Sequence, residues 1–340
     1  MKSLFSLPFT GPAIATLLVA LLVSLSTDRF LTEGNLNNLA LAVSIVALIA
    51  IGSTAVIIVG GIDLSPGSAI ALLTMVLAMM LKFWGIGFWP AIGLAVLGGA
   101  AIGLVNGAIT AYLRIPAFIT TLAGYSAYRG LAFMFNKGSP VFEASTRLEP
   151  LFYGKVLGVP LPLIYIVVFF AAAHWLMRHT RLGRSIYAVG GNASAARLSG
   201  INVRRVQLCA FVLAGLMAGV AAVLMAARLN SGSPNYGVGL ELSAIAAAVI
   251  GGASLAGGRG DMVATLFGAL TVTIVQNGLN LNGVQTSTQN IVLGAIIIMA
   301  VGLDMWRGEI GRALGAWTAW LLAVRGERRE GERREERKTQ

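Results

Sequence analysis

Charged side chains are scarce in this chain of 340 residues. Asp, Glu, Lys and Arg together make up 11% of it, whereas a soluble globular chain carries about 25%. A soluble protein of this length would lack the charged surface that keeps it in water. Hydrophobic residues at 56% also exclude a disordered chain. The composition therefore predicts a membrane protein.

The residues that carry most hydrolytic and metal chemistry are also few, since the chain has two histidines and one cysteine. Cys209 lies inside an apolar run and can form no disulfide within the chain, so we predict a packing role for it. His174 and His179 form no His-Glu-x-x-His motif. An intramembrane enzyme needs such ligands, paired Asp residues, or a Ser with a base. The sequence thus predicts no catalytic residue, no metal site and no enzyme.

A phosphate-binding loop is missing as well. The pattern Gly-x-x-x-x-Gly-Lys-[Ser/Thr] does not occur, and the glycine pairs at 60–61, 251–252 and 257–258 lack the following lysine. We therefore expect the chain to bind no nucleotide or other cofactor itself. Its energy comes from a nucleotide-hydrolysing partner or from an ion gradient, or it uses none.

Long apolar runs are abundant instead. Continuous runs of about 20 residues are typical of transmembrane helices and not of the alternating strands of a barrel. The 42 glycines suit helices whose backbones pack closely. We predict an all-α polytopic membrane protein with about ten transmembrane helices, at 11–27, 37–59, 67–84, 87–112, 116–136, 158–178, 206–228, 241–257, 262–281 and 289–306.

The eighth run, 241–257, is short and ends in a glycine-rich segment. A broken or re-entrant helix is tolerated in a membrane only where protein buries it or where it lines a wet cavity. The count of ten depends on whether this segment crosses.

Basic residues indicate the orientation. Lys and Arg accumulate on the cytoplasmic side of spanning proteins, and six arginines lie between the sixth and seventh runs, so we place that region in the cytoplasm. With ten spans both termini are then cytoplasmic, and the inside holds eighteen basic residues against six outside. This topology explains the net charge of +11 without nucleic acid. The six arginines of this cytoplasmic region, which starts at the end of the sixth run, are Arg178, Arg181, Arg184, Arg197, Arg204 and Arg205.

The sequence predicts one transmembrane domain, 1–306, with a cytoplasmic loop at 179–205. A cytoplasmic tail follows at 307–340. Its apolar segment 313–324 is too short to span and is predicted to lie along the membrane surface, and the Glu/Arg-rich end is predicted to be solvated.

The cytoplasmic loop contains signals for a short helix. Asn192 suits an N-cap for a helix over 193–199, and Gly200 suits its left-handed stop. Ala195 and Ala196 would give it a small apolar face. A helix of this length is marginal alone, so it is either a docking element for another protein or a turn into the next span.

Several motifs resemble the monosaccharide permeases of ABC importers. The loop Ser194-Ala-Ala-x-x-x-Gly200 is similar to the Glu-Ala-Ala-x-x-x-Gly loop by which such permeases meet their ATPase, with Ser194 in place of the glutamate. Residues 60–68, Gly-Gly-Ile-Asp-Leu-Ser-Pro-Gly-Ser, follow the family signature except at Pro66. Further segments that follow the ribose, xylose and galactofuranose type in order lie at 106–107, 115–124, 129–130, 250–260 and 277–281.

The resemblance implies a type II ABC importer permease fold in a bacterial inner membrane. It implies as partners a second permease copy or close paralogue, a cytoplasmic ABC ATPase that uses ATP and Mg, and an extracytoplasmic sugar-binding protein. The implied function is to form the translocation path for a monosaccharide. Nucleoside and branched-chain amino-acid ABC permeases, and a gradient-driven secondary transporter, are the alternatives. The residues implied in ATPase coupling are Gly190, Gly191, Asn192, Ser194, Ala195, Ala196, Arg197 and Gly200.

Ionisable residues inside a bilayer are costly and need an explanation. Asp63 is predicted to cap the helix that begins at Pro66 or Gly67, with substrate contact, gating or assembly as alternatives. Arg129 would pair with a carboxylate, bond to helix-end carbonyls or snorkel outward.

Neutral polar residues in or near the spans can hydrogen-bond a sugar or tie helices together. Both roles remain open from the sequence. The candidates for the translocation path or its gate are Asp63, Ser65, Asn106, Thr120, Thr121, Gln276, Asn277 and Asn280.

Overall fold

The computed structural model describes residues 9–302 of the chain. The sites below all lie in one compact unit, which ends at residue 297. The predicted tail, 307–340, with its surface segment 313–324, lies outside the described residues.

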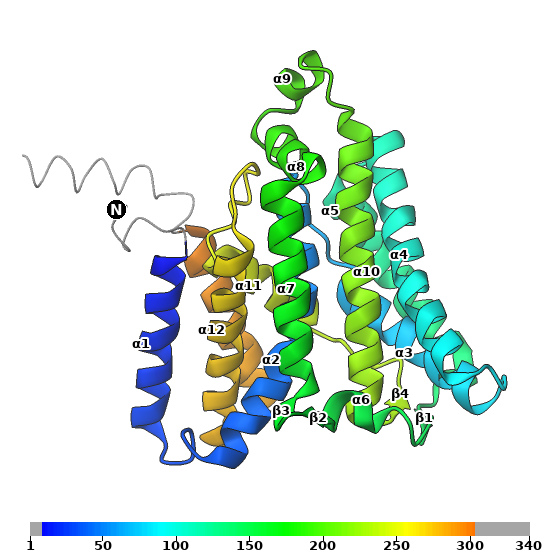
Figure 1. Cartoon of the computed structure of the whole chain (residues 1–340), viewed down its shortest axis with the longest axis vertical. Helices are drawn as coiled ribbons and strands as arrows, with labels where there is room; N and C mark the ends of the chain where they lie inside the picture. The colour runs from blue at the N-terminus through cyan, green and yellow to red at the C-terminus, as the bar shows by residue number, and fades with distance from the viewer. Residues whose placement is uncertain (1–8, 303–340) are drawn as a thin grey trace, which may run out of the picture. The chain divides into compact units, whose positions relative to one another are not determined.

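The described chain is built almost wholly from helices, with the two strand pairs at the opposite end from α9 (Figure 1). β1 pairs with β4 and β2 with β3, both antiparallel. The elements are α1 (Thr10–Ser26), α2 (Glu33–Ile58), α3 (Pro66–Lys82), α4 (Phe88–Tyr112), α5 (Ala117–Met134), η2 (Phe135–Gly138), β1 (Val141–Phe142), α6 (Glu149–Tyr153), β2 (Lys155–Val156), β3 (Val159–Pro160), α7 (Leu161–His179), α8 (Arg181–Gly191), α9 (Ala193–Leu198), α10 (Val203–Leu229), β4 (Ser231–Gly232), α11 (Leu240–Ile250), α12 (Met262–Leu281) and a further helix Thr286–Gly302.

Helices form at all ten predicted spans. Within the described range, five are long and apolar enough to cross a membrane: α2, α4, α7, α10 and α12. Shorter apolar helices are α1, α3, α11 and Thr286–Gly302. The multi-pass helical character is confirmed, while the number ten stays a prediction.

The helix α11 shows how the short eighth run, 241–257, is built. Its eleven residues extend about 16 Å at 1.5 Å per residue, roughly half of the hydrocarbon thickness. The helix ends at Ile250 because Gly251 and Gly252 turn the chain, Gly252 at φ +84°. The segment 241–257 is therefore broken and does not cross as one helix.

α2 forms the centre of the bundle. Every residue from Val43 to Ile58 is buried, as expected of a helix that is apolar on all sides and enclosed by protein. α1 differs, because its leucines are exposed, Leu17 at 70% and Leu25 at 76%. Such a face suits contact with lipid.

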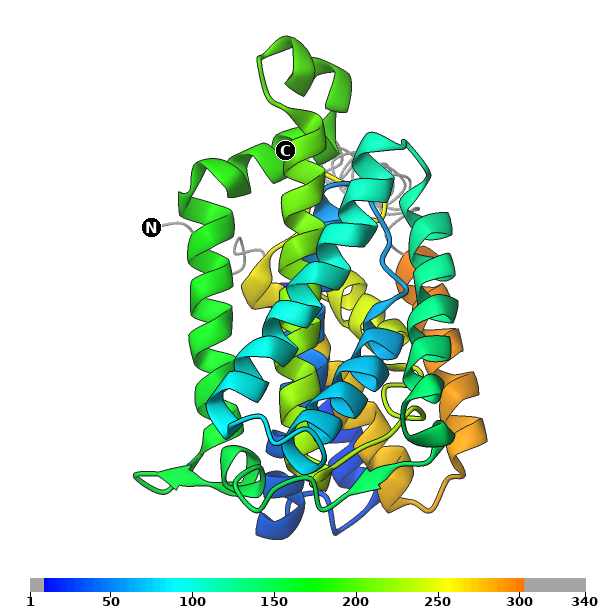
Figure 2. The ribbon, with the colours of Figure 1, turned by 90° about the vertical axis from the view of Figure 1, so that its right-hand side faces the viewer.

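Glycines bring α4 and α10 together (Figure 2). A Cβ atom on Gly103 would lie 2.2 Å from the Phe211 carbonyl oxygen, and one on Gly215 would lie 2.2 Å from the Gly99 carbonyl oxygen. No side chain fits at these positions, so the two backbones are in direct contact. Small residues at membrane helix interfaces permit this approach.

We predict that Gly103→Val destabilises the protein by about 1–3 kcal/mol, the usual cost of overpacking. The branched side chain would collide with the α10 backbone. Thermal unfolding of the detergent-solubilised chain should show a melting temperature several degrees lower. Gly93→Val is the matched control in α4, because nothing lies within 4 Å of its Cβ position. Equal melting temperatures for the two variants would contradict the close α4–α10 contact.

Candidate functional site

The predicted cytoplasmic loop, 179–205, folds into two short helices, α8 and α9, which together are called the coupling element after their predicted role. Asn192 caps α9, since its Oδ1 accepts a hydrogen bond from the Ala195 amide at 2.9 Å. Gly200 is left-handed at φ +82°. Both predictions for this short helix are confirmed. The sequence analysis did not predict α8. Its N-cap was a local signal, since the Thr180 hydroxyl accepts a hydrogen bond from the Gly183 amide.

α9 stands at the end of the bundle (Figure 1). Its Leu198 side chain is 91% exposed, whereas Ala196 is buried. A leucine exposed to water contributes no burial energy to so short a helix. The geometry therefore favours a docking element over a simple turn.

Gly190 in α8 fits the coupling element onto the bundle. A Cβ atom there would lie 1.7 Å from the Ile58 carbonyl oxygen at the end of α2. That same oxygen accepts a hydrogen bond from the Gly258 amide at 2.8 Å. The end of α8, the end of α2 and the glycine-rich segment after α11 therefore meet backbone to backbone.

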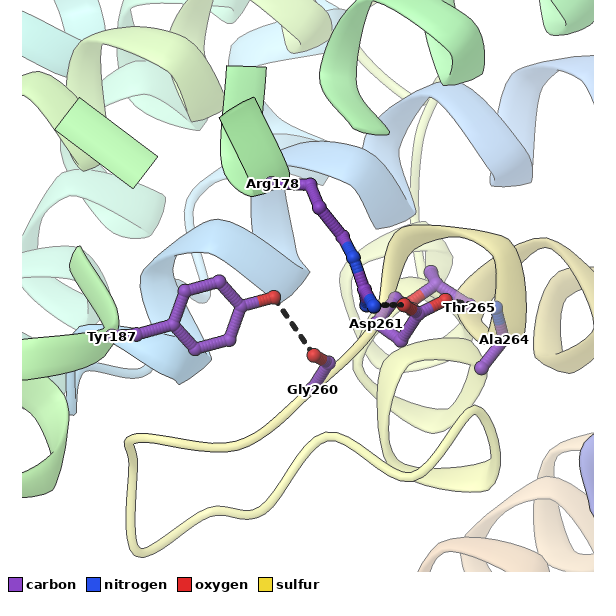
Figure 3. Close-up of polar contacts among 6 residues, drawn as sticks. All are labelled: Arg178, Tyr187, Gly260, Asp261, Ala264 and Thr265. Carbon is purple, nitrogen blue, oxygen red and sulfur yellow. Dashed lines mark hydrogen bonds and ion pairs between the residues drawn. The ribbon is translucent and has the colours of Figure 1, made fainter. Parts of the chain in front are cut away.

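Side chains tie the same region to α12 (Figure 3). Tyr187 in α8 donates to the Gly260 carbonyl at 2.8 Å. Asp261 caps α12 by accepting from the Ala264 amide at 3.1 Å, and lies 3.8 Å from Arg178. Burial, and then the Asp261 charge, raise the pKa of Tyr187, so its phenol stays a neutral donor at physiological pH. The ion pair adds little, because Arg178 is 61% exposed.

A groove of about 360 Å³, called here the arginine groove, lies beside α9. Arg114, Arg197 and Arg204 line it, and it contains no carboxylate. The Gly60–Gly61 pair forms part of its wall. Its positive field suits an acidic group from outside the chain.

Four polar side chains form a hydrogen-bonded chain inside the bundle. Tyr128 in α5 donates to Asn106 Oδ1 at 2.7 Å, and Asn106 in α4 donates to Ser65 Oγ at 2.9 Å. Ser65 donates to Asp63 Oδ1 through both its hydroxyl, at 2.7 Å, and its amide, at 2.9 Å. The structure brings together the predicted Asp63, Ser65 and Asn106, and adds Tyr128, which we did not predict.

The prediction that Asp63 caps α3 is wrong. Ser65 is the N-cap residue and no side chain caps the helix. Pro66 at the first helical position has no N–H, so the carboxylate of Asp63 bonds instead to Ser65 ahead of the helix.

The two predicted threonines of α5 differ. Thr121 donates to the Ile62 carbonyl at 3.1 Å, which holds the chain just before Asp63. Thr120 Oγ1 is buried and has no hydrogen-bond partner among the described residues. The structure therefore places Thr121, but not Thr120, in this network.

Arg129 bonds to backbone carbonyls, but these lie in an irregular segment and not at a helix end as one of the three predicted alternatives had it. Its Nη1 donates to the carbonyls of Pro234 and Tyr236, in the segment before α11. Its buried Nη2 has no partner in the part of the chain that the structure describes. Arg129 thus holds an irregular segment inside the bundle.

Glu241, in the first turn of α11, is a buried acid that the sequence analysis did not single out. It is 7% exposed. A Cβ atom on Gly67, in the first turn of α3, would lie 2.0 Å from Glu241 Oε2. The carboxylate therefore sits at the N-terminus of α3, where the helix dipole favours a negative charge. The sequence held one signal for it, because Glu241 follows Gly239 by two residues and so falls in the first turn of a helix that begins after this glycine.

The predicted Gln276, Asn277 and Asn280 meet elsewhere, in a cavity of about 620 Å³ at the end of the bundle away from α9 (Figure 1), which is called here the outer cavity. Asn277 and Asn35 exchange hydrogen bonds at 2.8 and 3.0 Å, and Gln276 donates to Ser243 Oγ at 3.2 Å. The predicted path residues thus form two groups rather than one. Neutral amide or hydroxyl side chains supply ten of the sixteen lining residues: Asn35, Asn38, Tyr153, Thr273, Gln276, Asn277, Asn280, Thr286, Gln289 and Asn290.

Comparison with known proteins adds a family match. The family described as "Branched-chain amino acid transport system / permease component" matches residues 35–301. This range includes the coupling element, the hydrogen-bonded chain and the outer cavity. No solved structure matches the chain.

Curated relatives match over nearly their whole lengths. The ribose import permease protein RbsC of Escherichia coli (strain K12) is 44% identical over 295 residues, 86% of this chain and 92% of that protein. The D-allose transport system permease protein AlsC of the same strain is 38% identical, covering 86% and 89%. The L-arabinose ABC transporter permease protein AraH of Azospirillum brasilense is 36% identical, covering 90% of each chain.

We predict that Tyr128→Phe destabilises the protein by about 1–3 kcal/mol, because Asn106 Oδ1 loses its donor inside the bundle. Tyr125→Phe is the control one turn earlier in α5. Its ring lies 5.6 Å from the Arg129 guanidinium carbon, a contact that phenylalanine retains, so little change is expected. Thermal unfolding in detergent measures both. Two equally stable variants would remove Tyr128 from the network.

Proposed function

Because this chain belongs to the family described as the branched-chain amino acid transport system / permease component, we propose that it is the membrane permease subunit of an ATP-driven ABC importer for a monosaccharide. The main support for this proposal is the 44% identity to a ribose import permease, which extends over 92% of that protein. Relatives named for allose and arabinose transport match over similar lengths. Sugars are the solutes that these relatives share.

The proposed partner at the coupling element is a cytoplasmic ABC ATPase, which binds and hydrolyses ATP with Mg. The chain binds no cofactor itself. The exposed Leu198 of α9 supplies an apolar contact, and the arginine groove beside it supplies charge. An ATPase surface with a hydrophobic pocket next to an acidic side chain fits both features.

Motion of the ATPase would reach the bundle through Gly190. This residue contacts the end of α2, and the chain continues from Ile58 through the glycine pair to Asp63. Asp63 in turn connects through Ser65 and Asn106 to α4 and α5. A shift of α8 would therefore move the N-terminus of α3 relative to α5, the place where a gate is expected.

The remaining assembly follows the topology. In the proposed topology the broken segment around α11 crosses together with nine other spans, and both termini are cytoplasmic. This places α9 inside the cell and the segment from 135 to 160 outside it. A second permease copy or close paralogue completes the path, and an extracytoplasmic binding protein delivers the sugar. The proposed location is a bacterial inner membrane, with lipid around the bundle.

Branched-chain amino acids are the second candidate, favoured by the family's description. An amino acid carries a carboxylate and an ammonium group, and both would need a charged partner away from water. The outer cavity has Arg228 but no carboxylate. The lining therefore favours the sugar.

We predict uptake of a monosaccharide by proteoliposomes that contain the permease, its ATPase and the binding protein. Uptake should require ATP, persist with ionophores and favour a sugar among ribose, allose, arabinose, leucine and a nucleoside. Radiolabelled solutes measure this. Uptake by the chain alone that ionophores abolish, or leucine uptake without sugar uptake, would contradict the proposal.

Gly190→Ala should lower this uptake about tenfold, which corresponds to about 1.4 kcal/mol. The added methyl group overlaps the Ile58 carbonyl oxygen, and overpacking costs about 1–3 kcal/mol. Gly191→Ala is the neighbouring control, because nothing lies within 4 Å of its Cβ position. ATP hydrolysis by the complex is measured in parallel. Equal uptake by the two variants would exclude this contact from coupling.

A further inference from the structure

We propose that the outer cavity is a binding site for a neutral polyhydroxylated solute, occupied before the solute enters the bundle. The inference rests on the proposed function, and it adds a place where the permease itself holds the sugar. The cavity lies between the outer ends of α2 and α12, beside α6, at the end of the bundle away from α9 (Figure 1).

The lining matches the chemistry of sugar hydroxyls. Each amide offers two N–H donors and a carbonyl acceptor, and each sugar hydroxyl both donates and accepts. Ten of the sixteen lining residues carry a neutral amide or hydroxyl. A carboxylate is absent from the lining, and Arg228 is its one residue with a permanent charge. Such a surface can exchange hydrogen bonds with a neutral solute while holding no ion tightly.

Part of the lining is fixed before any solute binds. Asn35 is 8% exposed and is held on two sides, by the Phe30 carbonyl at 2.9 Å and by Asn277. Gln276 is held by Ser243. These two amides therefore need no rearrangement before a solute binds to the polar atoms that they have left. Preorganised partners reduce the entropy lost on binding.

Other lining amides are free to bond a solute. Asn38 and Asn280 are exposed, and neither side chain has a hydrogen-bond partner among residues 9–302. They lie on α2 and α12, on different helices of the cavity. A solute between them could bond to both helices at once.

An aromatic pair completes the site. Tyr153 donates to the Arg228 carbonyl at 3.1 Å and leaves its ring 52% exposed. The buried ring of Phe152 lies 5.9 Å from the Arg228 guanidinium carbon, so the arginine is partly occupied by a cation–π contact. The exposed tyrosine ring gives an apolar face for sugar C–H groups, as binding pockets combine apolar walls with a few polar groups.

The size of the cavity agrees with a small solute. Its volume of about 620 Å³ lies within the range of about 300–1,000 Å³ typical of small-molecule pockets. A monosaccharide would fit with water around it. Such a loose fit suits a site that must release its solute onward.

Cysteine protection tests the proposal, because Cys209 is the one cysteine of the sequence. In a Cys209→Ser background, Asn280→Cys and Asn38→Cys place a thiol in the cavity. Asn37→Cys is the matched control, exposed next to Asn38 but not part of the lining. The full permease–ATPase complex in nanodiscs is labelled with a charged, membrane-impermeant maleimide, with and without ribose, allose or arabinose.

We expect one of these sugars to slow labelling at 280 and 38 about threefold when its concentration is twice its dissociation constant, since free sites then fall to a third. Labelling at 37 should not change, and leucine should protect no position. Titrating the sugar should give one saturation curve for both cavity positions.

Three results would overturn the inference. They are an absence of protection by each sugar, equal protection at 37, and protection by anionic lipid in the nanodisc instead of sugar. ATP-dependent sugar uptake by the same complex is measured alongside. If uptake occurs without protection, the cavity site fails and the proposed function stands, whereas a complex that imports no sugar counts against the proposed function itself.

Discussion

Direct contact between helix backbones at glycines is the constraint on which the rest of this structure depends. Lipid offers no hydrophobic driving force between helices, so close packing must hold them. At Gly103 and Gly215 the backbones of α4 and α10 touch, and at Gly190 the backbone of α8 touches that of α2. The first contact fixes the bundle, and the second fixes the coupling element to it. Stability and coupling therefore use the same type of contact.

This packing separates two polar regions with different properties. The hydrogen-bonded chain from Asp63 to Tyr128 is enclosed and links three helical segments. The outer cavity is open, and its amides are only partly paired. The enclosed network suits a part that moves as a unit, whereas the open cavity suits reversible contact with a solute. The distinction arises from burial, since both regions use the same neutral polar groups.

Much of the fold could be predicted from the sequence, because apolar runs and caps are local signals. The ten helical segments and the cap at Asn192 are of this kind. α11 needed more, since only the structure shows that its helix stops at Ile250. Less of the candidate site could be predicted from the sequence. The Asn35–Asn277 pair joins residues 242 apart in the sequence, and Tyr128 carries no local signal of its bond to Asn106. Such contacts arise from packing and not from spacing.

The junction between α3 and the half-length helix α11 bears on how tightly the bundle is closed at rest. Glu241 lies against the first turn of α3 and near the Arg129 charge. If α3 and α11 moved apart, this carboxylate would lose the favourable field of the α3 N-terminus, worth up to about 2 kcal/mol in a partly buried site. Thermal motion alone would seldom separate them. The junction thus resists opening at rest, and in the importer proposed above the energy that opens it would come from the ATPase subunit.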